Sequence, residues 1–165
     1  MSTDDWCSPP EVAEPLEQLM GGPVDVDPCS NLRSIVRAKI SYTAGGLHLP
    51  WGRTTYENPP YSRMLLWTAK GLAEIQRRNV FELVRLVPVA TSAEWWRLAV
   101  GESAYNGVKA GRRPTIVFTK RLAFLDENGQ AQGVARFDSA LFYYGNRRSS
   151  FLREFKNITS WHWNG

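Results

Sequence analysis

Apolar residues follow two different spacings along the chain, and these spacings separate helices from strands. Residues 8–20, 62–78 and 91–100 repeat an apolar residue every three or four positions, which predicts helices with one buried face. Short apolar or β-branched runs predict strands at residues 23–27, 54–57, 83–87, 115–118, 122–125 and 139–144. Two shorter helices are expected at residues 30–38 and 149–155. This order predicts an α/β fold with a parallel central sheet and a carboxyl-terminal part rich in strands.

Turn-forming residues mark where these elements end. Ser8 is placed to cap the first helix, with Pro9 in its first turn, and Gly21 follows its last residue. The same reasoning gives the third helix a cap at Thr91 or Ser92. Glycine and proline make residues 42–53 a loop, residues 126–133 form a polar loop, and residues 156–165 are a tail beyond a core of about residues 5–155.

Composition limits the functional classes. A chain of 165 residues with 43% hydrophobic residues has room for one domain and none for a separate target-recognition domain. The formal net charge of +4 suits a polyanionic partner without identifying one. The two cysteines and two histidines are not closely spaced, so no metal is expected. No apolar run is long enough to cross a bilayer and no signal peptide is present, so a soluble, cytoplasmic protein is expected.

The segment Asn58-Pro59-Pro60-Tyr61 carries the most chemical information. It lies between a predicted strand and a predicted helix, at the kind of strand end where open α/β sheets bind ligands. The amino group of a planar base is a poor nucleophile, because its lone pair is delocalised into the ring. Two hydrogen-bond acceptors can draw that nitrogen towards tetrahedral geometry as it attacks a methyl donor.

These acceptors are present in the motif. The side-chain oxygen of Asn58 can be one, the carbonyl between Pro59 and Pro60 can be the other, and Tyr61 can stack on the base. For the four residues alone, a strand-to-loop turn or a polyproline ligand stays an alternative.

Several segments resemble, in order, the compact phage-type DNA N-6-adenine methyltransferases. They are residues 5–12, 24–30, 51–52, 58–63, 86–96, 120–124 and 139–145. Asn-Pro-Pro-Tyr is the catalytic motif of amino-methyltransferases with a seven-stranded, Rossmann-like sheet. The resemblance therefore implies a mostly parallel Rossmann-like sheet with a β-rich carboxyl-terminal end. It also implies methyl transfer from S-adenosyl-L-methionine to the N6 amino group of adenine in DNA.

The resemblance also implies which residues bind S-adenosylmethionine. They are Ser8, Pro9, Asp25, Asp27, Pro28 and Asn58. A carboxylate at the end of the first strand can accept hydrogen bonds from ribose hydroxyls or form an ion pair with the amino group of the cofactor. Asp25 and Asp27 can equally cap the following helix. The chain departs from the family pattern at Cys29-Ser30-Asn31, where typical methyltransferases have a Gly-x-Gly loop, so the cofactor loop here must differ.

Basic and aromatic residues supply the candidate DNA contacts. These are Tyr61, Arg63, Arg112, Arg113 and Arg121, the last preceded by Lys120 where the family has glycine. Basic pairs along the chain form a phosphate track if they share the face of Tyr61, and are otherwise solvated surface. At most one of Trp95 and Trp96 is expected in the pocket. Without a recognition domain, the loops at 43–56 and 105–114 are expected to set any sequence preference.

Two other functions stay open. The same motif serves the methylation of other planar amino groups, including protein glutamine amides and guanine N2 in RNA. The second alternative is an inactive nucleic-acid-binding module of methyltransferase ancestry, which the missing Gly-x-Gly loop favours.

Overall fold

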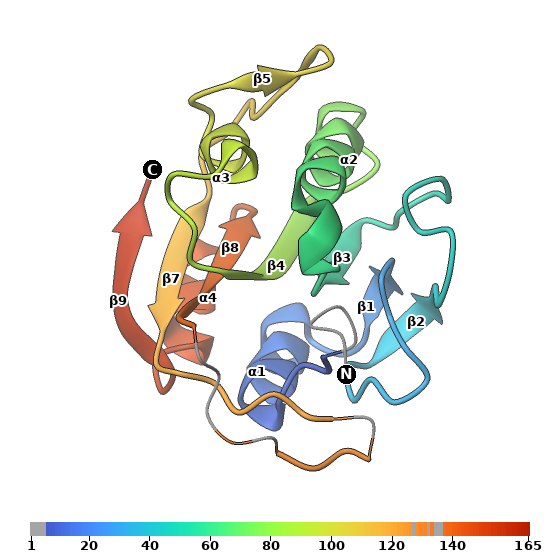
Figure 1. Ribbon diagram of the computed structural model, residues 1–165, viewed down its shortest axis with the longest axis vertical. Helices are drawn as coiled ribbons and strands as arrows, with labels where there is room; N and C mark the ends of the chain where they lie inside the picture. The colour runs from blue at the N-terminus through green and yellow to red at the C-terminus, as the bar shows by residue number, and fades with distance from the viewer. Residues whose placement is uncertain (1–5, 127, 132, 134–136) are drawn as a thin grey trace.

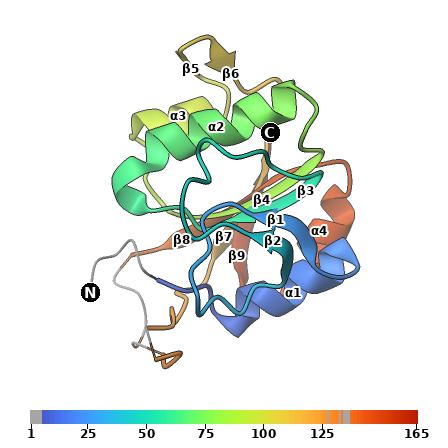
Figure 2. The same cartoon turned by 90° about the vertical axis from the view of Figure 1, so that its right-hand side faces the viewer.

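The computed structural model describes residues 6–126, 128–131, 133 and 137–165, which form a mixed α/β structure around one large sheet (Figures 1 and 2). The strands of this sheet are β1 (Val24–Asp27), β2 (Ala38–Ser41), β3 (Thr54–Glu57), β4 (Glu82–Pro88), β7 (Thr115–Thr119), β8 (Ser139–Tyr144) and β9 (Thr159–Asn164). The helices are α1 (Pro10–Met20), α2 (Met64–Gln76), α3 (Glu94–Ala99) and α4 (Arg148–Glu154), and a 3-10 turn, η2 (Tyr61–Arg63), precedes α2. A separate hairpin joins β5 (Ala104–Tyr105) to β6 (Val108–Lys109).

The sheet has two halves with different strand directions. Its seven strands lie in the order β2-β1-β3-β4-β8-β7-β9. The first four are parallel to one another, whereas β8, β7 and β9 continue the sheet through antiparallel pairings. The predicted α/β fold with a β-rich end is therefore confirmed, and the parallel part is confined to the first four strands. The chain leaves β1 towards β2 on one side and later returns to β3 on the other, which creates a topological switch point between β1 and β3.

Helices cover both faces of the sheet. Figure 2 shows α2 and α3 on one face and α1 and α4 on the other. Side chains along β4 alternate between the two faces of the sheet, which explains this arrangement. Val84 and Leu86 pack in the core beneath α1 and α4. Leu83 and Val87 pack beneath α2 and α3. Both faces of β4 are buried, as expected for a strand covered on both sides, and Arg85 is the one charged side chain among its fully buried residues.

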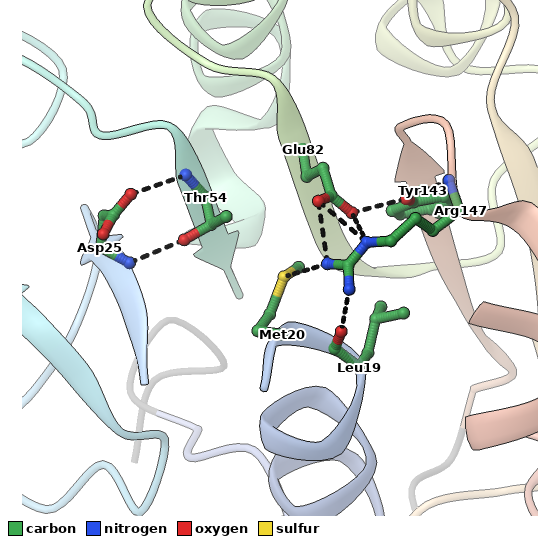
Figure 3. A network of polar contacts seen from close by, with 7 residues as sticks. All are labelled: Leu19, Met20, Asp25, Thr54, Glu82, Tyr143 and Arg147. Carbon is green, nitrogen blue, oxygen red and sulfur yellow. Dashed lines mark hydrogen bonds and ion pairs between the residues drawn. The ribbon is translucent and has the colours of Figure 1, made fainter. Parts of the chain in front are cut away.

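The end of α1 is fixed by its own backbone and by one arginine. Gly21 has a φ of 71°, and the N–H groups of Gly21 and Gly22 donate to carbonyls in the last turn, so the predicted glycine stop is confirmed. The Arg147 guanidinium donates to the carbonyl of Leu19 at 2.6 Å and to the carboxylate of Glu82 (Figure 3). Arg147 therefore ties α1 to the first residue of β4.

Both predicted side-chain caps are wrong. Pro9 occupies the cap position of α1, and its carbonyl accepts the N–H groups of Val12 and Ala13. Ser8 caps nothing, because its hydroxyl is buried against the Tyr56 hydroxyl at 2.6 Å. The third helix begins at Glu94 after Ala93, so neither Thr91 nor Ser92 caps it.

Three predicted elements also differ from the structure. Residues 30–37 form turns and irregular backbone rather than a helix, and Ala38 begins β2. Asn31 Oδ1 accepts the Arg33 N–H and Ser34 Oγ accepts the Val36 N–H, and such side-chain bonds compete with a helix. Residues 122–125 form no strand, and their only β-bridges to described residues are two isolated ones at Leu125, to Cys7 and to Ala131. The predicted tail contains β9, which pairs with β7. Asp5 of the predicted core and residues 127 and 132 of the predicted loop lie outside the described residues.

Candidate active site

A cleft opens at the switch point, where the carboxyl ends of β1 and β3 lie next to each other. Its volume is about 370 Å³, within the range of small-molecule sites. Pro28 to Asn31 line it after β1, Tyr42 to Gly46 line it after β2, and Asn58 and Pro60 line it after β3. Open α/β sheets bind ligands at this position because the strand ends diverge there.

The side chain of Asn58 is held in one orientation within this cleft. Its Nδ2 donates to the carbonyl of Trp6 at 2.9 Å, and its backbone N–H donates to the sulfur of Cys29. The amide oxygen Oδ1 accepts no hydrogen bond from any residue that the structure describes. Because Nδ2 faces Trp6, the free atom of this amide is an acceptor.

A second free acceptor comes from the two prolines. Pro59 is buried and Pro60 is extended, with φ −53° and ψ 123°. The first hydrogen bond of the following turn runs from the Arg63 N–H to the Pro60 carbonyl at 3.1 Å. The Pro59 carbonyl takes part in none of the backbone hydrogen bonds between described residues outside the regular elements. The motif thus has two oxygens at the end of β3, Asn58 Oδ1 and the Pro59 carbonyl, for which the described part of the chain shows no donor.

Tyr61 belongs to an aromatic cluster beside the cleft. Its ring meets those of Trp6 and Phe137 edge to face, at centroid separations of 6.5 and 5.6 Å. Its hydroxyl is buried without a hydrogen-bond partner within the described part of the chain, and burial raises its pKa above the ordinary value. Trp6, rather than Tyr61, lines the cleft itself. Stacking of Tyr61 on a base stays a prediction.

The residues expected to bind the cofactor lie at different depths. Of the six, Pro28 and Asn58 line the cleft. Ser8 and Pro9 are buried and do not line the cleft, and the Ser8 hydroxyl lies 2.6 Å from that of Tyr56. Asp25 faces the start of β3, where its carboxylate accepts the Thr54 N–H at 3.1 Å (Figure 3). The same carboxylate pairs with Lys39 at 2.7 Å.

Asp27 is buried at the end of β1, beneath the loop that lines the cleft. Its side chain is 3% exposed, and its Oδ1 accepts the backbone N–H of Cys29 at 3.2 Å. Burial raises the pKa of Asp27 to about 7, and the nearby Glu57 carboxylate acts in the same direction. The geometry makes Asp27 a support for residues 28–30, which themselves face the cleft.

A buried ion pair braces the strand end that carries the motif. Arg85 on β4 is fully buried and pairs with Glu57, the residue before Asn58. The same guanidinium donates to Thr68 Oγ1 at 2.7 Å and to the Trp67 carbonyl at 2.9 Å, both on α2. Arg85 therefore connects β3, β4 and α2, the three elements around the motif.

Sequence reasoning missed Tyr42 and Trp67 in the cleft wall, and it included Gly46 only as part of the 43–56 loop expected to set sequence preference. Tyr42, Gly46 and Trp67 line the cleft, and a β-carbon at Gly46 would lie 1.7 Å from the carbonyl oxygen of Pro28. The Trp51 indole donates to the Gly46 carbonyl at 2.8 Å and stacks on Trp67. The Gly45-Gly46 and Trp51-Gly52 pairs were visible as loop residues, but nothing local in the sequence indicates this packing.

The predicted DNA contacts divide between the two ends of the sheet. Arg63 lines the cleft, and Arg121 follows the end of β7 at the same edge. Arg112 lies at the opposite edge, beside Glu82 at the start of β4. The hairpin of the 105–114 loop packs there against α2, since the Gln76 side chain donates to the Lys109 carbonyl. The basic pairs therefore do not all lie at the edge of the sheet that carries Tyr61, so the condition for a single phosphate track on that face is not met.

The two adjacent tryptophans belong to the core. Trp95 and Trp96 are 8% and 5% exposed and pack on Phe142 beneath α3. Neither lines the cleft, which agrees with the expectation that at most one of them lies there.

The described residues contain neither a cluster of metal ligands nor a helix that could span a membrane. No group of three or more potential metal ligands is found among them. None of the helices found among these residues has the length and apolar character needed to span a membrane.

A family model described as DNA N-6-adenine-methyltransferase (Dam) matches residues 1–140 of the chain. The matched region contains every residue that lines the cleft. No curated protein and no solved structure gives a match.

Proposed function

Because the chain belongs to the DNA N-6-adenine-methyltransferase family, we propose that it transfers a methyl group from S-adenosylmethionine to the N6 amino group of adenine in DNA. The sheet then serves as a compact Rossmann-like methyltransferase core. The parallel strands β2, β1, β3 and β4 and the switch point beside the motif support this assignment.

One observation carries the proposal, namely the pair of free acceptors at the end of β3. An exocyclic amino group has two N–H donors, and Asn58 Oδ1 and the Pro59 carbonyl can accept one each. Both oxygens are held in place before a base binds. The Asn58 side chain is oriented by its hydrogen bond to Trp6, and its backbone by the hydrogen bond to Cys29. The Pro59 carbonyl is held by the rigid rings of Pro59 and Pro60. Preorganised acceptors favour the tetrahedral nitrogen that forms during attack over the planar ground state.

The cleft suits S-adenosylmethionine in size and in its mixture of groups. Polar atoms come from Ser30, Asn31 and Asn58, and aromatic surface comes from Trp6 and Trp67. The Trp67 indole N–H is buried and has no acceptor among the described residues, so a bound group can satisfy it. The cofactor would supply an activated methyl group on its sulfonium. In this arrangement residues 28–31 and Asn58 hold it, and Asp27 supports that loop from below.

The test identifies the methylated product. Purified protein is incubated with unmethylated DNA and S-adenosylmethionine, the DNA is digested to nucleosides, and N6-methyladenine is quantified by mass spectrometry. We expect the product from the wild type and a loss on the order of 100-fold or more in Asn58→Ala, as for removal of other preorganised hydrogen-bonding groups. Arg153→Ala, an exposed change on α4, is the matched control.

The other outcomes separate the alternatives. If calorimetry shows cofactor binding but DNA yields no methylated base, the substrate is RNA or a protein amide. If neither product nor cofactor binding is observed, the protein is an inactive binding module.

A further inference from the structure

An aromatic groove lies between α3 and the edge strand β9, outside the cleft. Its volume is about 250 Å³, and its lining includes Trp96, Phe118, Trp161, Trp163, Arg113 and Glu102. The β7–β9 register pairs Phe118 with Trp161 and Ile116 with Trp163. Residues two apart on a strand share a face, so both tryptophans project from β9 towards the α3 side.

Trp161 forms a supported stacking platform in this groove. Its ring lies parallel to that of Phe118, with centroids 4.0 Å apart and planes 7° apart. The residue is nevertheless 56% exposed. One face of the indole is therefore held by Phe118, while much of the remaining surface is open to solvent. A flat, rigid aromatic surface of this kind binds nucleobases by stacking, whatever their identity.

Positive charge is placed at both ends of the groove. Arg113, which lines the groove, precedes β7, and Lys120 and Arg121 follow it. The seven steps from Arg113 to Lys120 span roughly 23 Å of extended chain, which is enough to contact several phosphates of one strand. Of these side chains only Arg121 has an ion pair with a described residue, at 3.5 Å from Asp138 with both side chains exposed, so the charges are available to a polyanion.

The groove lies within reach of the cleft. Thr91, which follows β4 at the carboxyl edge of the sheet, lines the groove. In the order β3-β4-β8-β7, three strand spacings separate β3 from β7, or about 15 Å. A DNA strand that places an adenine at Asn58 can therefore place nucleotides a short distance away against β7 and β9.

We propose that the β7–β9 groove binds unpaired nucleotides that flank the target adenine, with one base stacked on Trp161 and the phosphates meeting Arg113 at the start of β7 and Lys120 and Arg121 at its end. This inference rests on the proposed DNA substrate and makes it more specific. Paired bases in a duplex do not expose their faces, so the groove favours single-stranded or locally opened DNA.

The test is equilibrium binding, measured by fluorescence anisotropy with a labelled single strand of about 15 nucleotides and with its duplex. Stacking is worth about 1–3 kcal/mol per base, so Trp161→Ala is expected to weaken single-strand binding roughly 5- to 150-fold. Trp161→Phe keeps a ring and retains most of the affinity. Glu102→Gln removes the acid of the groove and tightens binding, most strongly at low salt. Phe81→Ala, an exposed aromatic at the opposite edge, is the control and leaves binding unchanged.

The outcomes distinguish this inference from the proposed function. Unchanged single-strand affinity in Trp161→Ala overturns the groove assignment, even if N6-methyladenine is formed. Equal weakening for single strand and duplex overturns the preference for unpaired bases. Selective loss of single-strand affinity supports the groove, and an accompanying absence of methylated product would overturn only the catalytic proposal.

Discussion

Replacement of Asp27 by asparagine provides a quantitative test of the buried support beneath the cleft. The carboxyl has an ordinary pKa of 3.8, and burial raises the pKa to about 7 in the folded protein. Asparagine keeps the side-chain oxygen that accepts the Cys29 N–H but cannot ionise. The difference between the two proteins therefore isolates the cost of a buried charge.

The direction in which pH changes the free energy of unfolding follows from proton binding to Asp27. Between pH 3.8 and about 7 the folded protein keeps the Asp27 proton and the unfolded chain has lost it, so the free energy of unfolding falls as the pH rises through this window. The whole shift corresponds to about 4 kcal/mol. Roughly 2.5 kcal/mol of this lies between pH 5 and pH 8. Above the folded pKa the contribution of this residue levels off.

The assay is urea unfolding of the wild type and Asp27→Asn at several pH values from 5 to 8. The stability of the wild type relative to the variant should decline by roughly 2.5 kcal/mol across this range. Any pH-independent effect of the substitution cancels in this comparison. A difference that stays flat from pH 5 to pH 8 would refute the assignment of a raised pKa to Asp27.

Three further substitutions test the surroundings of the motif. Arg85→Met should lower the free energy of unfolding by about 3–5 kcal/mol, because it leaves Glu57 buried and charged, and adding Glu57→Gln should restore much of the loss in urea unfolding. Tyr56→Phe removes a buried 2.6 Å hydrogen bond and should cost about 1–3 kcal/mol; a thermal melt unchanged from the wild type would contradict this. Gly46→Ala should weaken cofactor binding on the order of 10-fold or more in calorimetry, because its β-carbon has no room beneath the cleft. Gly111→Ala, where nothing lies within 4 Å of the added carbon, is the control and should bind normally.

Local patterns predicted the elements on which the site is built. The strands at 54–57 and 139–144 have the predicted bounds, because β-prone residues end at the prolines of the motif in one case and at Gly145 in the other. The position of the motif between a strand and a helix is likewise confirmed. These features depend on neighbouring residues alone, so a single sequence contains them.

Features that depend on contacts between distant residues could not be predicted from the sequence. The Asn58 amide is oriented by Trp6, 52 positions away, and nothing near either residue signals that contact. The missed β9 is different, because Trp161 and Trp163 alternate with polar residues, which is the spacing of a strand with one covered face. Residues 31–37 form turns because the side chains of Asn31 and Ser34 accept hydrogen bonds from nearby backbone N–H groups, and the helical pattern of this segment is weak.

The bond from Asn58 to the Trp6 carbonyl restricts how this protein and its relatives can exchange segments. An aspartate at position 58 would place a carboxylate oxygen against that carbonyl, so a donor is required there. The partner is a main-chain atom, so the requirement concerns the path of the backbone at position 6 rather than its side chain. In a chimera that takes its first helix from a relative, an insertion or deletion between residue 6 and α1 would therefore turn the amide of Asn58, even though the motif itself was inherited intact.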